Sequence, residues 1–129
     1  MSPTYHFEHI HLLSRDPKTT AQYYRKMFDA KVIETVQPDG RPRIDLDLNG
    51  LPIFILRVAP EENVAVSPTG PYLGLDHFGR RVNNLDEVVA ELKRRGCEFV
   101  KEPRTVWPGL RIAYIRGPED VRIELLERT

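Results

Sequence analysis

The alternation of hydrophobic and polar residues along the chain predicts a protein rich in β-strands. The clearest alternation runs from Arg43 to Leu48, so its charged and apolar side chains lie on opposite faces of a strand. Asn49-Gly50 follows and is typical of a tight hairpin turn. Further strands are predicted over residues 6–13, 31–36, 51–58, 72–82, 97–101, 111–116 and 121–126.

Two segments have helical periodicity and recognisable ends. Asp16-Pro17 is typical of an N-cap followed by proline at the first helical position, and it predicts an amphipathic helix over residues 17–28. Asn84 is a second N-cap, followed by apolar residues at helical spacing and ended by Gly96.

The order of these elements repeats. Phe7-Glu-His9-Ile falls on Leu75-Asp-His77-Phe at an offset of 68 residues, and Arg43-Ile falls on Arg111-Ile at the same offset. The hairpins that end the two halves align Phe54 with Glu124 if the Asn49-Gly50 turn is two residues shorter than its counterpart. An internal duplication of this size predicts two units that share a core. We therefore expect an α+β fold of two tandem βαβββ modules whose mixed sheets curve around a central cavity. The modules are predicted over 5–58 and 72–128, joined by a linker over 59–71.

Composition excludes several classes of protein. The 19 basic and 19 acidic residues give no net charge, which argues against nucleic-acid binding. No apolar run approaches the roughly 18–20 residues of a membrane-spanning helix. The first residues lack a basic and apolar signal region, so we expect a cytoplasmic protein. Cys97, the single cysteine, excludes an internal disulfide and a zinc–thiolate site and is expected to be buried.

The strand over 121–126 contains a carboxylate that needs an explanation. Glu124 lies between Ile123 and Leu125, and it must be solvated, paired or bound to a cation. In the duplicated sheet, His9 and His77 occupy equivalent strands and point toward the same cavity. Each of the three residues, taken singly, is more often structural or exposed. Together, two imidazoles and one carboxylate suit a divalent transition metal with open coordination positions.

Four segments carry a resemblance to a known family. They are Phe7-Glu-His9-Ile-His-Leu-Leu-Ser-Arg-Asp16-Pro, the helix with Tyr23-Tyr24 and Met27-Phe28-Asp-Ala-Lys, Leu75-Asp-His77-Phe, and Gly117-Pro-Glu-Asp-Val-Arg-Ile-Glu124-Leu. Over nearly its whole length the chain resembles the vicinal oxygen chelate superfamily. That superfamily includes glyoxalases, extradiol dioxygenases, fosfomycin-resistance proteins, epimerases and bleomycin-binding proteins.

The resemblance implies a metal site and a class of substrate. His9, His77 and Glu124 match the family's ligands for a divalent ion, which would be Fe, Mn, Ni, Co or Zn. Phe54 stands where glyoxalase-like members have a further ligand, so the remaining set is similar to that of extradiol dioxygenases. The implied substrate is a small molecule that chelates the metal through neighbouring oxygens, in lyase, isomerase or dioxygenase chemistry. A homodimer is also implied.

The alternative to a metal-dependent enzyme is a metal-free protein that sequesters a ligand, as bleomycin-resistance proteins do. Such proteins lack the metal triad, so the presence of His9, His77 and Glu124 argues against this alternative.

Several more side chains are predicted to face the cavity. His11 is a candidate further ligand or general base, or a hydrogen-bonded cavity histidine, and Asp45 and Asp47 are candidate bases or solvated carboxylates. The candidate substrate contacts are Phe54, Arg43, Arg111, Arg122 and Trp107. The arginines would bind a carboxylate or phosphate or pair with the aspartates, and Trp107 would form a lid or pack in its loop. Tyr114 is predicted on the helix-covered face, in the core.

Overall fold

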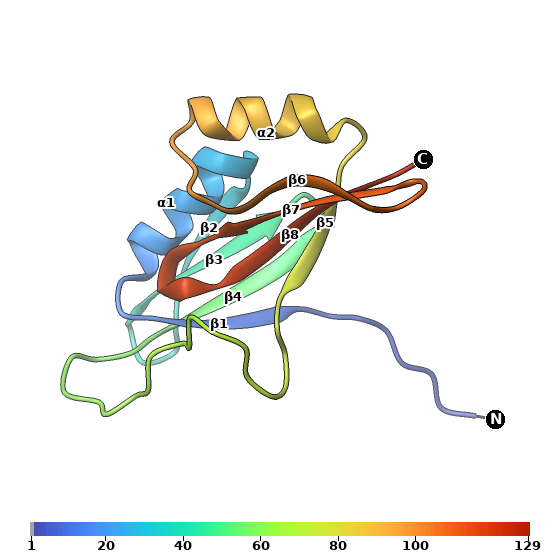
Figure 1. Ribbon diagram of the computed structural model, residues 1–129. Helices are drawn as coiled ribbons and strands as arrows, with labels where there is room; N and C mark the ends of the chain where they lie inside the picture. Colours follow the sequence, from blue (N-terminus) through green and yellow to red (C-terminus); the bar gives the residue numbers. More distant parts are fainter. Residues whose placement is uncertain (1) are drawn as a thin grey trace. The chain divides into compact units, whose positions relative to one another are not determined.

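The chain forms two compact units, one ending at Val64 and the other beginning at Ala65. The structure is a computed structural model that describes residues 2–129. Each unit contains a four-stranded mixed sheet with one α-helix (Figure 1). The predicted α+β fold with two βαβββ modules is confirmed. None of the helices in residues 2–129 is long and apolar enough to cross a membrane.

The first unit has the strand order β1-β4-β3-β2, in which β1 and β4 are parallel and the other pairs are antiparallel. Its elements are β1 (Ile10–Ser14), α1 (Pro17–Phe28), β2 (Lys31–Val36), β3 (Pro42–Leu48) and β4 (Leu51–Arg57). The second unit repeats this topology as β5-β8-β7-β6. Its elements are β5 (Phe78–Arg81), α2 (Leu85–Arg94), β6 (Phe99–Trp107), β7 (Leu110–Arg116), the short 3-10 helix η1 (Pro118–Asp120) and β8 (Arg122–Arg128).

Both helices begin where their capping residues predicted. The Asp16 side chain accepts a hydrogen bond from Thr19 N, and the Asn84 side chain accepts one from Glu87 N. Each helix buries its apolar stripe against one face of its own sheet. The buried residues of the first unit include Ala21, Tyr24, Leu46, Leu48, Ile53 and Ile55, and those of the second include Leu85, Val89, Leu92, Ile115, Ile123 and Leu125. Cys97 is buried, as expected.

The strands differ from the prediction in two places. The first strand of each unit is shorter than predicted and begins after its histidine, at Ile10 and at Phe78. The second strand of the second unit is longer than predicted, because β6 continues through the predicted loop around Pro103. β6 lies at the edge of its sheet and pairs with β7 through several register shifts, a setting that tolerates proline. Trp107 therefore ends a strand and was wrongly placed in a loop.

Strand register confirms the internal repeat at its most informative position. Phe54 pairs with His11 across β4 and β1, and Glu124 pairs with Gly79 across β8 and β5. Since His11 and Gly79 are 68 residues apart, Phe54 and Glu124 occupy equivalent positions, as predicted. On the neighbouring strands Asp45 pairs with Phe54, and Tyr114 with Glu124. Asp45 and Tyr114 are thus equivalent at an offset of 69, one more than the first strands show.

That difference of one residue corrects two predictions, because a slip of one position moves a side chain to the other face of a sheet. Tyr114 was predicted on the helix-covered face, yet it lies directly opposite Glu124 and on the same face. Arg111 was predicted on the face of Glu124, yet it lies opposite Glu127, and its Nη1 is 3.0 Å from Asp86 Oδ2 in α2. Arg111 therefore packs on the helix side of the sheet.

Replacing Tyr24 by phenylalanine tests the core of the first unit. The Tyr24 hydroxyl is buried and has no hydrogen-bond partner among the residues that the structure describes, and burial raises the pKa of Tyr24 above its usual value. Tyr24→Phe removes an unpaired polar group, so the free energy of unfolding at neutral pH should stay within about 1 kcal/mol or increase.

The raised pKa also gives an alkaline signature. The unfolded chain ionises this tyrosine near pH 10, whereas the folded chain retains the proton, so stability falls as the pH rises above about 10. Tyr24→Phe should make this fall shallower in urea titrations at pH 8 to 11. Tyr5→Phe, at a position 88% exposed, serves as the control. A variant that is clearly less stable at neutral pH would contradict the assignment.

Candidate metal centre

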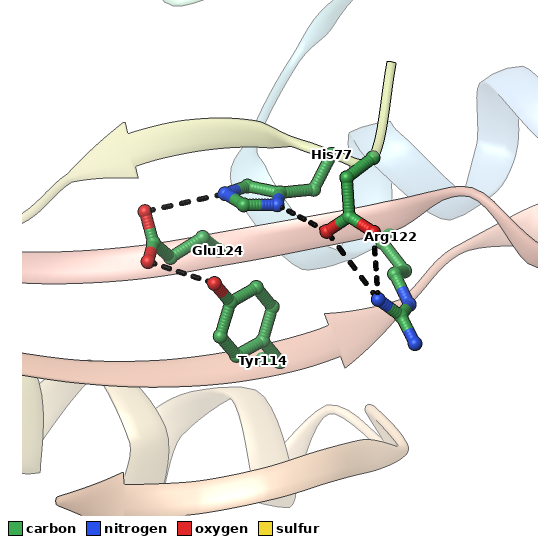
Figure 2. Close-up of polar contacts among 5 residues, drawn as sticks. His77, Tyr114, Arg122 and Glu124 are labelled. Atoms are coloured by element: carbon green, nitrogen blue, oxygen red, sulfur yellow. Dashed lines mark hydrogen bonds and ion pairs between the residues drawn. The ribbon is translucent and has the colours of Figure 1, made fainter. Parts of the chain in front are cut away.

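His77 and Glu124 face each other in the second unit. His77 immediately precedes β5, and Glu124 lies in β8, which pairs with β5 in parallel. His77 Nε2 is 3.6 Å from Glu124 Oε1 (Figure 2). Gly79 lies directly opposite Glu124, and a Cβ at Gly79 would be tight against Leu126 Cδ2 at 3.2 Å and in ordinary contact with Glu124 Oε1 at 3.4 Å. The register of β5 and β8 thus brings an imidazole and a carboxylate together.

Asp76 binds the other nitrogen of the His77 ring. Asp76 Oδ2 is 2.7 Å from His77 Nδ1, and Arg122 Nη1 donates to both Asp76 oxygens at 3.0 and 3.3 Å. The hydrogen bond with His77, and then the charge of Arg122, lower the pKa of Asp76. This carboxylate is therefore charged and accepts a hydrogen bond from His77. In a neutral His77 the proton therefore lies on Nδ1, and the lone pair of Nε2 points toward Glu124.

Tyr114 fixes the second oxygen of Glu124. Its hydroxyl donates to Glu124 Oε2 at 3.0 Å, and its ring meets the His77 ring edge-on at a centroid distance of 5.1 Å (Figure 2). Burial, and then the Glu124 carboxylate, raise the pKa of Tyr114, so the phenol stays protonated and remains a donor. Glu124 thus has one oxygen held by Tyr114 and one directed at His77.

This donor set fits a divalent ion. A neutral Nε2 and a charged Oε1 both present lone pairs, so without a proton or a cation between them they repel each other. Bonds of about 2.1 Å from one ion reach both atoms at a separation of 3.6 Å. The Asp76 contact is also the usual arrangement of a metal-binding histidine, whose second nitrogen donates to a carboxylate.

The first unit repeats the carboxylate–histidine contact. His9 Nδ1 lies 3.0 and 3.1 Å from the two oxygens of Glu8, the residue equivalent to Asp76. The position equivalent to Glu124 is Phe54, whose ring centroid is 4.2 Å from that of His9. A phenyl ring cannot bind a metal through oxygen or nitrogen, so the first unit supplies one imidazole and lacks the carboxylate.

The remaining candidates of the first unit are brought together around Phe54. His11 is 6.1 Å from both the His9 and Phe54 rings, and the Arg43 guanidinium lies 4.9 Å over the Phe54 ring. Asp45 is already engaged: Oδ2 accepts from Arg43 Nε at 2.7 Å and Oδ1 from Ile55 N at 2.9 Å.

Other predicted site residues have structural contacts. Asp47 accepts from Gly50 N at 2.7 Å and so supports the hairpin turn. Arg111 pairs with α2 and lies outside the His77–Glu124 cluster. Trp107, at the end of β6, is 57% exposed. Over residues 2–129, neither unit by itself gathers three His, Cys, Asp or Glu side chains into a metal-binding group.

Three supporting residues were missed by the reasoning from sequence. Asp76 and Glu8 each precede a candidate ligand, and the repeated acidic residue–histidine pair in the two halves was a visible signal for both. Tyr114 was missed because the alignment of the two halves was one residue out of register at β7, which placed its side chain on the wrong face of the sheet.

The tautomer of His77 tests the role of Asp76. We expect long-range ¹H–¹⁵N spectra of the metal-free protein, recorded where the ring is neutral, to place the proton on Nδ1. Asp76→Ala removes the acceptor and should shift the population toward the Nε2–H form, whereas Asp86→Ala, which removes the partner of Arg111, should not. An Nε2–H ring in the wild type would contradict the proposed orientation of the lone pair.

Comparison with known proteins identifies the family. The model of the Glyoxalase/Bleomycin resistance protein/Dioxygenase superfamily matches residues 6–125. Among solved structures, the glyoxalase family protein from Enterococcus faecalis has 25% identity and a TM-score of 0.73, with 95% of this chain and 97% of that chain covered. The fosfomycin resistance protein FosX from Listeria monocytogenes has 20% identity and a TM-score of 0.73, with 98% and 96% covered.

A Glu-to-Gln mutant of FosX, in complex with Mn(II) and 1S,2S-dihydroxypropylphosphonic acid, has 21% identity and a TM-score of 0.71, with 98% and 93% covered. No match was found among curated proteins. The family match spans nearly the whole chain, and the chain belongs to the Glyoxalase/Bleomycin resistance protein/Dioxygenase superfamily.

Proposed function

We propose that the protein is a metal-dependent enzyme that acts on a small substrate with two neighbouring oxygens. One observation carries the proposal: Asp76 orients His77 so that Nε2 faces Glu124 Oε1 at 3.6 Å. Asp76 and Tyr114 restrain the two ligands before any ion binds, which reduces the cost of assembling the site.

His9 is the proposed third ligand. The resemblance of its segment to the family supports this role, as does the Glu8 contact, which holds Nδ1 in the way that Asp76 holds that of His77. With three protein ligands, positions of the ion stay open for substrate or water. The ion would be Fe, Mn, Ni, Co or Zn, and the Mn(II) complex of the FosX mutant makes Mn the first to test.

The bound ion would act as a Lewis acid that polarises the oxygens of the substrate. The protein's own groups then have separate tasks. Tyr114 donates to Glu124 and keeps that carboxylate in one orientation, and Arg122 holds Asp76. The chemistry would be of the lyase or isomerase kind, or oxygen-dependent ring cleavage. Oxygen uptake with a panel of catechols separates the two, because only a dioxygenase consumes oxygen.

We also propose that the protein is a cytoplasmic homodimer. Light scattering measures the mass of the particle in solution and so tests the dimer.

One observation favours a second candidate, a metal-free ligand-sequestering protein of the bleomycin-resistance type. Phe54 packs on His9 and offers an aromatic surface where glyoxalase-like members have a ligand. Such a protein would bind its ligand with no dependence on His77 or Glu124, so metal analysis decides between the two.

Metal content is the direct test of the enzyme proposal. Protein purified without chelators should contain close to one divalent ion per chain by elemental analysis. His77→Ala and Glu124→Ala each remove a ligand and should lose stoichiometric metal. His6→Ala and Glu98→Ala, at exposed positions of the same residue types, are the matched controls. A wild type that takes up none of the five metals would exclude the proposal.

Tyr114 gives a finer test, because it contacts a ligand without being one. Tyr114→Phe removes only the hydrogen bond to Glu124 Oε2. We expect the dissociation constant for the metal to increase by about 10–100-fold, as is usual when a group that supports a ligand is lost. Tyr72→Phe, outside the cluster, should change nothing. Unchanged metal affinity in a folded Tyr114→Phe protein would refute this role.

A further inference from the structure

The first unit contains a cleft of about 760 Å³. It is lined by residues of β1, β3 and β4, the start of α1, the turn before β3, and the segment after β4. A volume of this size is in the range of pockets that bind small organic molecules. All of its lining residues lie before Val64, so the cleft belongs to the first unit alone.

Four of the residues that line the cleft are cationic: Lys18, Arg41, Arg43 and Arg57. Arg57, near the end of β4, makes no side-chain hydrogen bond or ion pair with any residue of the described part of the chain. Arg43 uses Nε to bind Asp45 and lies over Phe54, while its two terminal nitrogens make no hydrogen bond within residues 2–129. Both guanidinium groups therefore retain donors, but Arg57 pairs with Ser14 and Arg43 lies over Phe54, on opposite faces of the sheet, so Arg57 is the candidate donor for a ligand.

The carboxylates that line the cleft reduce its positive charge but make no hydrogen bond with Arg57 or Arg43 in the described residues. Asp16 caps α1 through Thr19, and hydrogen bonds with Thr19 lower the pKa of Asp16. Glu62 accepts from Ala59 N at 3.1 Å and stabilises the segment after β4. Of the acidic residues that line the cleft, only Glu61 has no such contact in the described residues.

The rest of the lining is largely apolar and includes Pro42, Ile44 and Leu56. A guanidinium with unused donors beside an apolar wall is suited to a molecule with one oxyanion and an apolar body. Guanidinium binds carboxylate and phosphate oxygens in pairs, through bonds stronger than those between neutral groups.

We propose that this cleft binds a small organic molecule through a carboxylate or phosphate group, with Arg57 as its donor. His11 and Arg43 line the cleft from the face of Phe54, whereas Arg57 lines it from the face of Ser14. Binding of the anion therefore does not depend on the proposed metal ligands.

The test uses the full chain after treatment with a chelator, so that binding cannot depend on a metal. Phenyl phosphate, benzoate and benzyl alcohol are titrated into ¹⁵N-labelled protein and followed by NMR. At least one of the two anions should saturate the resonances of the cleft, and the tighter one identifies the preferred group. Benzyl alcohol, which has the same ring without the charge, should bind about tenfold more weakly or not at all.

Arg57→Gln should weaken binding of the anion about tenfold, since a charge-assisted pair of hydrogen bonds is lost. Arg57→Lys keeps the charge but lacks the paired N–H donors of the guanidinium, so it should recover part of the affinity. Arg25→Gln, on α1 and outside the cleft, is the matched control.

Three results would overturn the proposal: no binding of either anion, equal binding of benzyl alcohol, or Arg57→Gln binding as tightly as Arg25→Gln. Protein that takes up no metal but binds phenyl phosphate through Arg57 would refute the proposed function and leave the anion site standing.

Discussion

The hydrogen bond between His77 Nδ1 and Asp76 is the interaction on which the candidate site depends. It selects the tautomer, and the tautomer decides whether Nε2 is a donor or an acceptor toward Glu124. A proton on Nε2 would let His77 and Glu124 form an ordinary hydrogen bond and close the site. With the proton on Nδ1, two electron-pair donors face each other, a state that needs a cation or a second proton. Arg122 supports this arrangement because it donates hydrogen bonds to both oxygens of Asp76.

The helices were predictable from sequence, because their signals are local. Asp16 and Asn84 cap the helices by hydrogen bonds to residues three positions later, and the apolar stripes that follow are visible without any partner. The extent of β6 was not predictable in this way. Pro103 is typical of a loop, and only the edge position and the irregular pairing with β7 make it compatible with a strand.

The candidate site was predictable as far as the repeat is regular. The equivalence of Phe54 and Glu124 was correct, because both were aligned by the turns of their own hairpins. The faces of Arg111 and Tyr114 were wrong, because the offset between the halves changes by one residue and no pattern in β7 reveals it. The contacts of Asp76 with Arg122 and of Tyr114 with Glu124 join distant parts of the chain, which sequence spacing does not specify. The cleft beside Arg57 depends on three separate connections and had no sequence signature.

The two units have diverged at positions that are structurally equivalent. Where the second unit has Glu124 and Tyr114, the first has Phe54 and Asp45, so the carboxylate and the aromatic ring have exchanged strands. In the second unit Tyr114 donates to Glu124 and leaves Oε1 for an ion. In the first unit, Asp45 instead binds Arg43, and the Arg43 guanidinium lies over the Phe54 ring.

The same fold therefore presents different groups at equivalent positions. The second unit brings electron-pair donors together at His77 and Glu124, which suits the proposed cation, and the first unit has arginines along a cleft, which suits the proposed anion. Divergence at the Phe54 and Glu124 positions separates the two units chemically, because it places a carboxylate beside His77 and an aromatic ring beside His9.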